Sequence, residues 1–292
     1  NPDYFKPGLP YLDEWQYVLM DGTAISQAAF LTHKVDASGG NPTTDNKPLY
    51  AKKVASGEIY MLPYGTGCRP QGLNMNSTKP PFNDIRLRQA VNLAVDRDAY
   101  SIVVHDSYAE PHVYLDTGGW GKTEAQIRQL PGYRQPHQAD VDEAKKIVKE
   151  LYPNGLDIKM MTRNTSSYMT QGEFVAGELQ KIGLNVTIQA QDTNIVFDRA
   201  AKLDYTLWTY WFCQTTNTPE ELYGSYFITG GSRNWIGYSN PKIDAGYLDM
   251  AATTDLVQKK QKAQAMEDII YSFLPSVPLS VHTTSRNAYS YV

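Results

Sequence analysis

The amino-acid sequence predicts an α/β fold with a largely parallel sheet. Between residues 156 and 213, stretches typical of strands alternate with stretches of helical periodicity, in the order strand, helix, strand, helix, strand. This order is typical of parallel strands joined by right-handed crossovers. The length of 292 residues and the apolar content of 41% allow a substantial core, in one large domain or two ordinary ones.

The first eighty residues show shorter patterns. We expect a strand at 11–20, a helix at 22–33 with Asp21 as its N-cap, and short strands at 58–62 and 72–76.

The clearest helix of the chain lies within residues 79–100. Two prolines exclude a helix at 80–81, and Asn83 or Asp84 can cap the helix that follows. One apolar face recurs at helical spacing and comprises Leu87, Ala90, Val91, Ala94 and Val95. The polar residues around it are interpreted as a solvated face with local ion pairs, and they are Arg86, Arg88, Gln89, Asn92 and Arg97.

Beyond this helix the chain is expected to be irregular at 105–138. The remaining expected elements are a helix at 139–155, a strand at 156–164, a helix at 167–183, a strand at 184–191, a helix at 193–204, a strand at 205–213, a helix at 254–274 and a strand-like stretch at 276–292.

No motif for catalysis, for a metal or for a cofactor is found. The His residues are scattered at 33, 105, 112, 137 and 282, and there is no Cys-x-x-Cys, no Gly-x-Ser-x-Gly and no phosphate-binding Gly-x4-Gly-Lys motif. A net charge of −4 argues against a nucleic-acid partner. We therefore expect a binding protein with no catalytic residue, no metal and no cofactor.

Residues 80–100 carry a resemblance to a known family. The segment PPFNDIRLRQAVNLAVDRDAY is similar to the signature of the family 5 extracellular solute-binding proteins, which are peptide, nickel and oligosaccharide receptors of ABC importers. Further matches follow in the family's order, and they are NPDYFKPGLPYLDEW, ADVDEAKKIVKEL, FVAGELQKIGLNVTIQAQD, IGYSNPKIDAGYLDMAATTD and PSVPLSVHTTSRNAYSY.

The resemblance implies a two-lobed clamp of the type II periplasmic-binding-protein class. Family members are longer than this chain, so we expect a fragment in which one lobe is partial. This lobe is expected to comprise residues 1–79 and residues 282–292, where the chain returns to it. The other lobe, at 80–281, is expected to be nearly complete. Solute binds between the lobes and is delivered to the transmembrane subunits of a permease. The implied protein is a monomer, periplasmic or extracellular, with a possible lipid anchor on a segment absent from this chain.

The same resemblance implies a disulfide between Cys68 and Cys213, the only cysteines of the chain. Both fall where oligopeptide-binding members carry theirs, and an oxidising compartment favours the bond. It would close a loop of about 145 residues, which stabilises by roughly 5 kcal/mol at most in the chain-entropy model. Two unrelated buried thiols are the alternative.

One departure from the family bears on the solute. Peptide-binding members carry an Asp after the second Cys, which pairs with the α-ammonium of the peptide, and Thr215 occupies that position here. A hydroxyl does not neutralise a buried cation, and an unpaired buried charge costs several kcal/mol. Peptides with a free N-terminus are therefore doubtful solutes, unless Glu220 or Glu221 substitutes.

The residues expected to contact solute lie in and after the strand at 205–213, because ligands of such sheets bind beyond the carboxyl ends of the strands. They are Trp208, Tyr210, Trp211, Phe212, Gln214, Thr215 and Asn217. Alternation along the strand separates Trp208, Tyr210 and Phe212 from Trp211, but the sequence does not indicate which group faces the solute. Aromatic rings with amides and hydroxyls suit an oligosaccharide or a capped peptide.

Other classes of function stay open at this point. The chain could be a solute-sensing receptor domain, or an α/β enzyme whose site carries no known motif. A nickel receptor is disfavoured by the scattered His residues.

Overall fold

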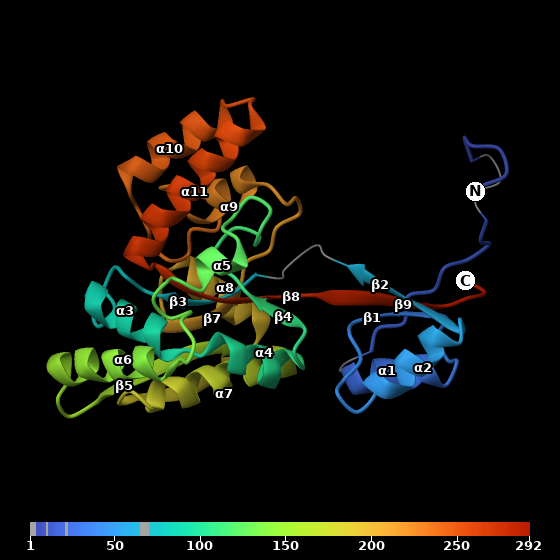
Figure 1. Ribbon diagram of the computed structural model, residues 1–292, viewed down its shortest axis with the longest axis horizontal. Coiled ribbons are helices and arrows are strands. Elements are labelled where there is room, and N and C mark those ends of the chain that lie inside the picture. The colour runs from blue at the N-terminus through green and yellow to red at the C-terminus, as the bar shows by residue number, and fades with distance from the viewer. Residues whose placement is uncertain (1–3, 10, 21–22, 65–69) are drawn as a thin grey trace. The chain divides into compact units, whose positions relative to one another are not determined.

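The computed structural model describes residues 4–9, 11–20, 23–64 and 70–292 (Figure 1). The chain divides into two compact units, residues 1–61 with 286–292, and residues 62–285. The lobe boundaries expected at 79/80 and 281/282 stay predictions.

The smaller unit combines a three-stranded sheet with two helices (Figure 1). Its elements are α1 (Thr23–Leu31), β1 (Ala37–Gly39), α2 (Lys47–Ala55), β2 (Ile59–Tyr64) and β9 (Thr284–Tyr289), and the sheet order is β1-β9-β2. The strand expected at 11–20 is wrong, because these residues are irregular and expose most of their large apolar side chains. Asp21, the expected cap of α1, lies outside the described residues.

A small core holds this unit together. Phe30, Tyr50, Ile59 and Tyr289 are buried in one cluster. The rings of Phe30 and Tyr289 lie 4.7 Å apart, and the Tyr289 hydroxyl donates to the carbonyl oxygen of Phe30 at 2.6 Å. The last strand of the chain is thus fixed to the first helix.

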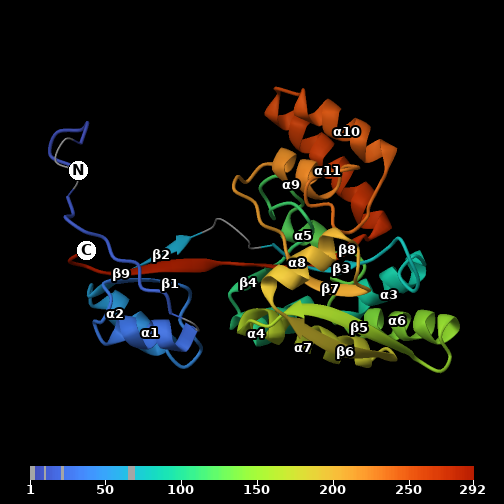
Figure 2. The same ribbon diagram turned by 180° about the vertical axis from the view of Figure 1, so that it is seen from behind.

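The larger unit is a six-stranded sheet with helices on both faces (Figures 1 and 2). Its strands are β3 (Pro70–Met75), β4 (Ala109–Pro111), β5 (Leu156–Arg163), β6 (Leu184–Gln191), β7 (Leu207–Trp211) and β8 (Ser276–His282). Its helices are α3 (Ile85–Ala94), α4 (Arg97–His105), α5 (Glu124–Ile127), α6 (Gln138–Leu151), α7 (Ser166–Gln180), α8 (Thr193–Ala201), α9 (Pro219–Tyr226), α10 (Pro241–Ala251) and α11 (Leu256–Phe273).

The sheet is mixed, in the order β4-β8-β3-β7-β5-β6. The parallel arrangement predicted from the β-α-β-α-β order is confirmed for β5, β6 and β7. It is wrong for the other half, where β3 runs antiparallel to both β7 and β8. The strand β3 precedes the β/α alternation in the chain and inserts beside β7, so no crossover helix sets its direction.

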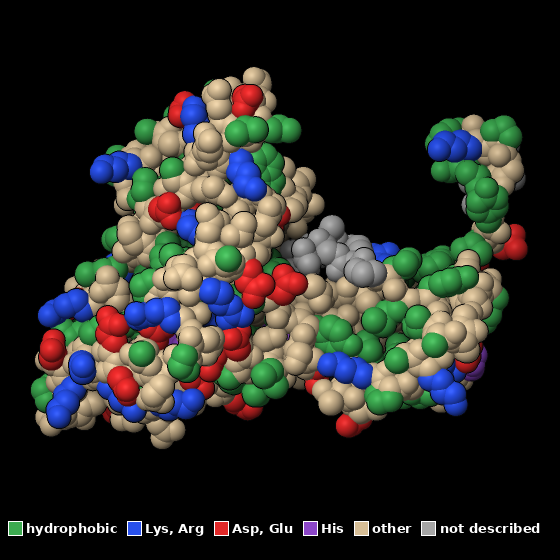
Figure 3. All heavy atoms as spheres, in the orientation of Figure 1, with side chains coloured by type: hydrophobic (Ala, Val, Ile, Leu, Met, Phe, Trp, Pro, Cys, Tyr) green, Lys and Arg blue, Asp and Glu red, His purple; other side chains and the backbone are tan. Residues whose placement is uncertain are grey.

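Each face of the sheet carries its own hydrophobic core. Helices α3, α4, α6 and α7 cover one face and contribute to the first core. Helices α8, α9, α10 and α11 contribute to the second core, on the other face. Because side chains alternate along β7, Leu207 enters the first core while Trp208 and Tyr210 enter the second. On the face seen in Figure 3, acidic and basic side chains of the larger unit are interspersed.

The helix expected at 79–100 is two helices. Asp84 caps α3 by accepting from the backbone N–H of Arg86 at 2.9 Å, and Asp96 caps α4 by accepting from the N–H groups of Asp98 and Ala99. Val95 between them has extended backbone angles, which ends α3. The segment expected to be irregular at 105–138 contains β4 and α5.

The interpretation of the polar residues around α3 as solvated is wrong for Arg88, Asn92 and Arg97, each of which is only 2% exposed. The Arg97 guanidinium donates to five backbone or side-chain oxygens, at distances of 2.6–3.1 Å. The acceptors are the carbonyl oxygens of Asn92, Val95, Gly132 and Pro278 and the side-chain oxygen of Asn92. A buried cation is tolerated here because every donor is used.

Gly132 is required for this arrangement. Its φ is +87°, and a Cβ at this position would lie 2.5 Å from the carbonyl oxygen of Asn92. The absence of a side chain lets the loop approach the guanidinium closely.

We expect Arg97→Met to lower the free energy of unfolding by roughly 3 kcal/mol or more, because five buried oxygens lose their donor. Urea unfolding followed by circular dichroism measures the change. Arg86→Met is the matched control, since Arg86 is exposed and pairs only with Asp84, and its urea midpoint should stay near that of the parent. Equal effects of the two substitutions would contradict the role of Arg97.

Candidate functional site

The candidate site lies at the edge of the large sheet where β5, β6, β7 and β8 end, here called the carboxyl edge. The register places Trp211 beside Gln71 and Val281 beside Pro70, so the ends of β7 and β8 flank the start of β3. Parallel strands present their carboxyl ends together, and this is where open α/β sheets bind ligands.

The turn that follows β7 is fixed by a tyrosine and an arginine. The backbone N–H of Cys213 donates to the Tyr226 hydroxyl at 2.9 Å, and that hydroxyl donates to the Cys213 carbonyl oxygen at 2.9 Å. Arg233 donates through Nη1 to the same carbonyl oxygen and to the Tyr226 hydroxyl, at 2.8 and 2.9 Å. The backbone of the turn is therefore held by groups from α9 and from the loop after it.

A glutamate in the first turn of α9 closes the turn from the other side. Glu221 Oε1 accepts from the N–H and the hydroxyl of Thr215, at 2.7 and 3.0 Å, and Oε2 accepts from the same two groups of Thr216, both at 2.6 Å. Burial alone would raise the pKa of Glu221, but these hydrogen bonds lower it to about 2. The four donors occupy the four lone-pair positions of the carboxylate.

The outer part of the turn contacts a second loop. Asn217 Nδ2 donates to Asp116 Oδ2 at 3.2 Å, and Trp120 Nε1 donates to the Asn217 carbonyl oxygen at 2.9 Å. In contrast, the side-chain amide of Gln214 makes no hydrogen bond with the described residues. Gln214 is thus the polar group of the turn that is available to a ligand.

Five flat side chains form a row along the carboxyl edge. The Arg163 guanidinium carbon lies 4.6 Å from the ring centroid of Tyr168, and that ring stacks on Trp211 at 4.9 Å. Trp211 lies 5.2 Å from His282, which stacks on His105 at 5.1 Å. The row joins residues from β5, α7, β7, β8 and α4, and such stacked contacts fix ring orientations.

Hydrogen bonds beneath the row keep it in place. Trp211 Nε1 donates to Gln171 Oε1 at 2.7 Å, and the Gln171 amide donates to the Gly72 carbonyl oxygen. Gln71 Oε1 lies 2.8 Å from His105 Nε2, which carries the proton in the tautomer that donates. Burial, assisted by His282, lowers the pKa of His105 to about 3, so this ring is neutral near pH 7.

The seven contact residues predicted from the sequence fall into two groups. Those at the carboxyl edge that are at least partly exposed are Trp211, Gln214, Thr215 and Asn217. Those buried in the second core, at 0–3% exposure, are Trp208, Tyr210 and Phe212. Trp211 is thus the partly exposed ring of β7, and the contact of any of these residues with solute stays a prediction.

Several residues of the site were not anticipated, and they are Arg163, Tyr168, Gln171, Tyr226, Arg233 and His282. Glu221 was considered only as a substitute for the missing Asp. Arg163 could have been found, since it ends a predicted parallel strand. Tyr168, Gln171 and His282 come from segments distant in the sequence, whereas Tyr226 and Arg233 follow the turn within about 20 residues, and no local pattern links any of them to it.

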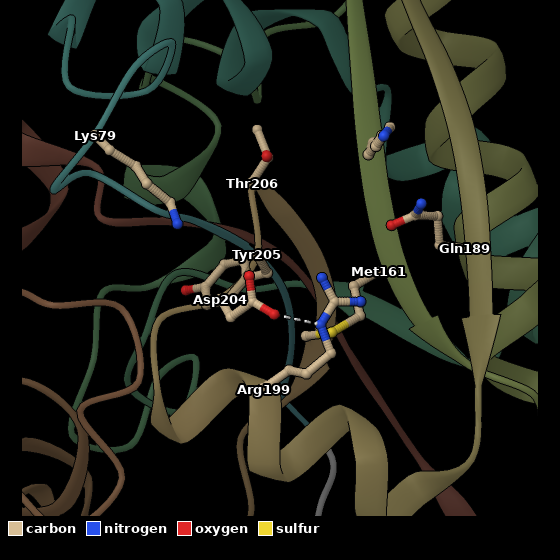
Figure 4. A pocket seen from close by; sticks show the side chains of 8 residues that line it. Lys79, Met161, Gln189, Arg199, Asp204, Tyr205 and Thr206 are labelled. Atoms are coloured by element: carbon tan, nitrogen blue, oxygen red, sulfur yellow. Dashed lines mark hydrogen bonds and ion pairs between the residues drawn. The ribbon is translucent and has the colours of Figure 1, made fainter.

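A pocket of about 350 Å³ lies elsewhere on the larger unit, near the amino end of β7 (Figure 4). Its lining includes Lys79, Lys159, Arg199 and Asp204. Arg199 Nε donates to Asp204 Oδ2 at 2.9 Å, and Lys79 Nζ donates to a backbone carbonyl oxygen at 2.9 Å. Because three of these four charges already have partners, the pocket is a weaker candidate than the carboxyl edge.

Within residues 4–9, 11–20, 23–64 and 70–292, no three His, Cys, Asp or Glu side chains are grouped to hold a metal ion. In the same part of the chain, every helix is too short or too polar to span a bilayer. Cys68, the expected partner of Cys213, lies outside the described residues.

Comparison with known proteins identifies the family. Residues 1–234 match the sequence profile of the bacterial extracellular solute-binding proteins, family 5 Middle. The chain belongs to this family. The family membership predicted from the sequence is confirmed.

Curated relatives and solved structures agree with this assignment. The chain is 26% identical over 294 residues to the glutathione-binding protein GsiB of Escherichia coli strain K12, covering 95% of this chain and 54% of the relative. It is 25% identical over 290 residues to GsiB of Pectobacterium atrosepticum, with the same shares. The chain thus spans about half the length of these relatives.

Solved structures of the family show the same fold. AgaA from A. tumefaciens R10, in complex with agropinic acid, matches with a TM-score of 0.78 at 22% identity. The match covers 99% of this chain and 57% of the AgaA chain. DppA from Helicobacter pylori, in complex with the peptide STSA, has a TM-score of 0.76 at 18% identity, with 91% and 51% covered. The predicted α/β fold of the periplasmic-binding-protein class is confirmed.

The four hydrogen bonds that Glu221 accepts from Thr215 and Thr216, here called the Glu221 clamp, predict a pH-dependent contribution of this carboxylate to the stability of the fold. The pKa of Glu221 is lower in the folded chain than in the unfolded chain, so its contribution is complete above about pH 4.5 and is lost as the pH falls towards about 2. The urea midpoint of Glu221→Gln should lie below that of the parent at pH 6, and the two should converge as the pH falls through this window.

Glu173→Gln is the control for this measurement, because Glu173 is exposed and makes no hydrogen bond with the described residues. Its difference from the parent should stay small at every pH. A Glu221→Gln difference that does not change with pH would contradict the clamp.

Proposed function

We propose that this chain is part of the substrate-binding component of an ABC importer, and that it captures solute at the carboxyl edge of its larger unit. The observation that carries the proposal is the fixed turn after β7. Hydrogen bonds from Tyr226, Arg233 and Glu221 hold the backbone, while the Gln214 amide makes no hydrogen bond with the described residues. Because the backbone of this surface is already ordered, solute binding costs little additional conformational entropy of the protein.

The proposed solute is a peptide or a small acid derived from an amino acid. The relatives are named for glutathione, a short peptide and agropinic acid, which share amide or carboxylate groups. Trp211, which is partly exposed and stacks on the buried Tyr168, supplies flat apolar surface for such a solute, and Gln214 supplies an amide. The same rings suit an oligosaccharide, which is the second candidate.

The charges around the turn favour a solute without a free ammonium group. Thr215 carries no charge, and the neighbouring Glu221 carboxylate already accepts four hydrogen bonds. Glu220 is paired with Lys259 at 2.6 Å, and Asp116 accepts from Asn217 and from the backbone of its own loop. In the described part of the turn, a peptide ammonium thus meets no carboxylate that lacks a partner.

The remaining parts of the proposal follow from the family. Its members are extracellular solute receptors, so we place the protein outside the cytoplasmic membrane, in the periplasm or on a lipid anchor. The partner is the permease of the importer, and the protein acts as a monomer. Its role is capture and delivery rather than catalysis.

We further propose the disulfide between Cys68 and Cys213 in this compartment. Alkylation of the denatured protein without reductant, followed by mass spectrometry, should label neither cysteine, and labelling of both should follow reduction. Labelling of both before reduction would contradict the bond.

Calorimetry on the protein expressed from its full gene tests the proposed solute class. The probes are trialanine, N-acetyltrialanine and cellotriose. We expect the acetylated peptide to bind at least as tightly as free trialanine. The reason is that each carboxylate near the described turn already has a partner, so none is left to pair with the α-ammonium group of trialanine. Clearly tighter binding of free trialanine would contradict the role given to Thr215. Binding of cellotriose alone would replace the peptide class by an oligosaccharide, and binding of none would contradict the proposal.

Gln214→Ala tests the location of the site. The substitution breaks no hydrogen bond among the described residues, so it should weaken peptide binding by about threefold to tenfold without changing stability. Gln180→Ala, at the exposed carboxyl end of α7, is the matched control and should leave affinity unchanged. Equal affinities of both variants and the parent would place the solute elsewhere.

A further inference from the structure

The indole of Trp211 is the partly exposed ring at the end of β7, and three neighbours set its orientation. It stacks on the Tyr168 ring, with the centroids 4.9 Å apart and the planes inclined by 19°. The His282 ring lies 5.2 Å away at an angle of 55°. The indole N–H, the only hydrogen-bonding group of the side chain, donates to Gln171 Oε1 at 2.7 Å. The ring is therefore restrained in orientation and has no unused donor.

Gln171 is suited to this contact by its chemistry. Its side chain is fully buried, and its amide nitrogen donates to the Gly72 carbonyl oxygen of β3 at 3.2 Å. The Trp211 N–H can only donate and the carbonyl oxygen can only accept, so a single orientation of the Gln171 amide satisfies both. The residue is thus a directional link between α7, β3 and the indole.

Tyr168 reinforces this link from the same helix. It precedes Gln171 by three residues, which places both side chains on one side of α7. The Tyr168 ring is itself held by Arg163, whose guanidinium stacks on it and hydrogen-bonds with its side chain. One short stretch of α7 therefore supplies both the surface beneath the indole and the acceptor for its N–H.

We propose that Gln171 is a positioning residue of the solute site, which turns the indole of Trp211 so that the ring meets solute through its carbon atoms alone. This inference rests on the proposed function, because it requires solute at the carboxyl edge. The group of the solute that contacts Trp211 is then apolar, such as an aliphatic side chain, because the ring has no donor left to offer. Gln171 acts through the ring and does not contact solute, since it is fully buried.

The first measurement needs no solute. In the ¹⁵N-labelled protein expressed from its full gene, the indole N–H of Trp211, assigned by the loss of its signal in Trp211→Phe, should exchange slowly with water. Gln171→Met removes both hydrogen bonds at a similar side-chain length, and the exchange should become about tenfold faster. Gln180→Met, at the exposed end of the same helix, is the control and should leave the exchange unchanged. Equal exchange in the parent and in Gln171→Met would overturn the inference.

A double-mutant cycle separates positioning from a general effect on folding. With N-acetyltrialanine as the probe, Gln171→Met should weaken binding by about threefold to tenfold in the parent background and have no effect in the Trp211→Phe background. A merely structural role would weaken binding by the same factor in both backgrounds, and that result would refute positioning through the ring. Parent-like binding by Gln171→Met would refute it too.

Gln171→Asn serves where Gln171→Met does not fold. It keeps the amide but is one methylene shorter, so the acceptor no longer reaches the Trp211 N–H. The faster exchange and the loss of affinity confined to the parent background should both recur in this variant. Slow exchange together with parent-like binding would overturn the inference.

The outcome is distinguishable from failure of the proposed function. Binding of N-acetyltrialanine that every Gln171 variant leaves unchanged would overturn the inference and keep the solute-binding proposal. A protein that binds neither trialanine, N-acetyltrialanine nor cellotriose would contradict the proposed function. Slow exchange in that protein, abolished by Gln171→Met, would still support the orientation of Trp211 by Gln171.

Discussion

The larger unit depends on the buried guanidinium of Arg97. Its donors join the end of α3, the loop at Gly132 and the strand β8 through the Pro278 carbonyl oxygen, and Tyr133 stacks on it with the ring centroid 4.0 Å away. These three segments are far apart in the sequence. A cation surrounded by carbonyl oxygens gives them one common geometry, because each oxygen must reach the same plane. The end of β8, and with it His282 of the carboxyl edge, is positioned as a consequence.

The carboxyl edge is rigid for a related reason. Side chains hold the backbone of the turn at Cys213, Thr215 and Thr216 by hydrogen bonds. These side chains are Glu221, Tyr226 and Arg233, which come from one short stretch of the sequence. The start of α9 is therefore both a helix and the support of the turn. Fixing these groups in advance lowers the entropy that a solute must lose on binding, so affinity depends on the few exposed groups that remain.

Sequence patterns were sufficient for the β/α alternation of the larger unit, since each of its elements has its own periodicity. They were insufficient where tertiary contacts override local chemistry. Arg88 and Arg97 occupy polar positions of a helix pattern yet are buried, because distant carbonyl oxygens satisfy them. The hydrogen bonds that Glu221 makes could not be foreseen, because a helix-start glutamate is usually solvated. At the site, strand alternation identified two possible faces, and only packing against Phe197 of α8 and against Trp235 decides that Trp208 belongs to the core.

Charge decides more about the solute than shape does at this edge. Removing a cation from water requires a partner, and the acids near the turn are all engaged, by threonines, by Lys259 or by an asparagine. A solute that brings its own ammonium would leave that charge uncompensated here. We therefore propose that this edge disfavours the free ammonium end of a peptide, which makes an N-blocked solute the better match to these residues.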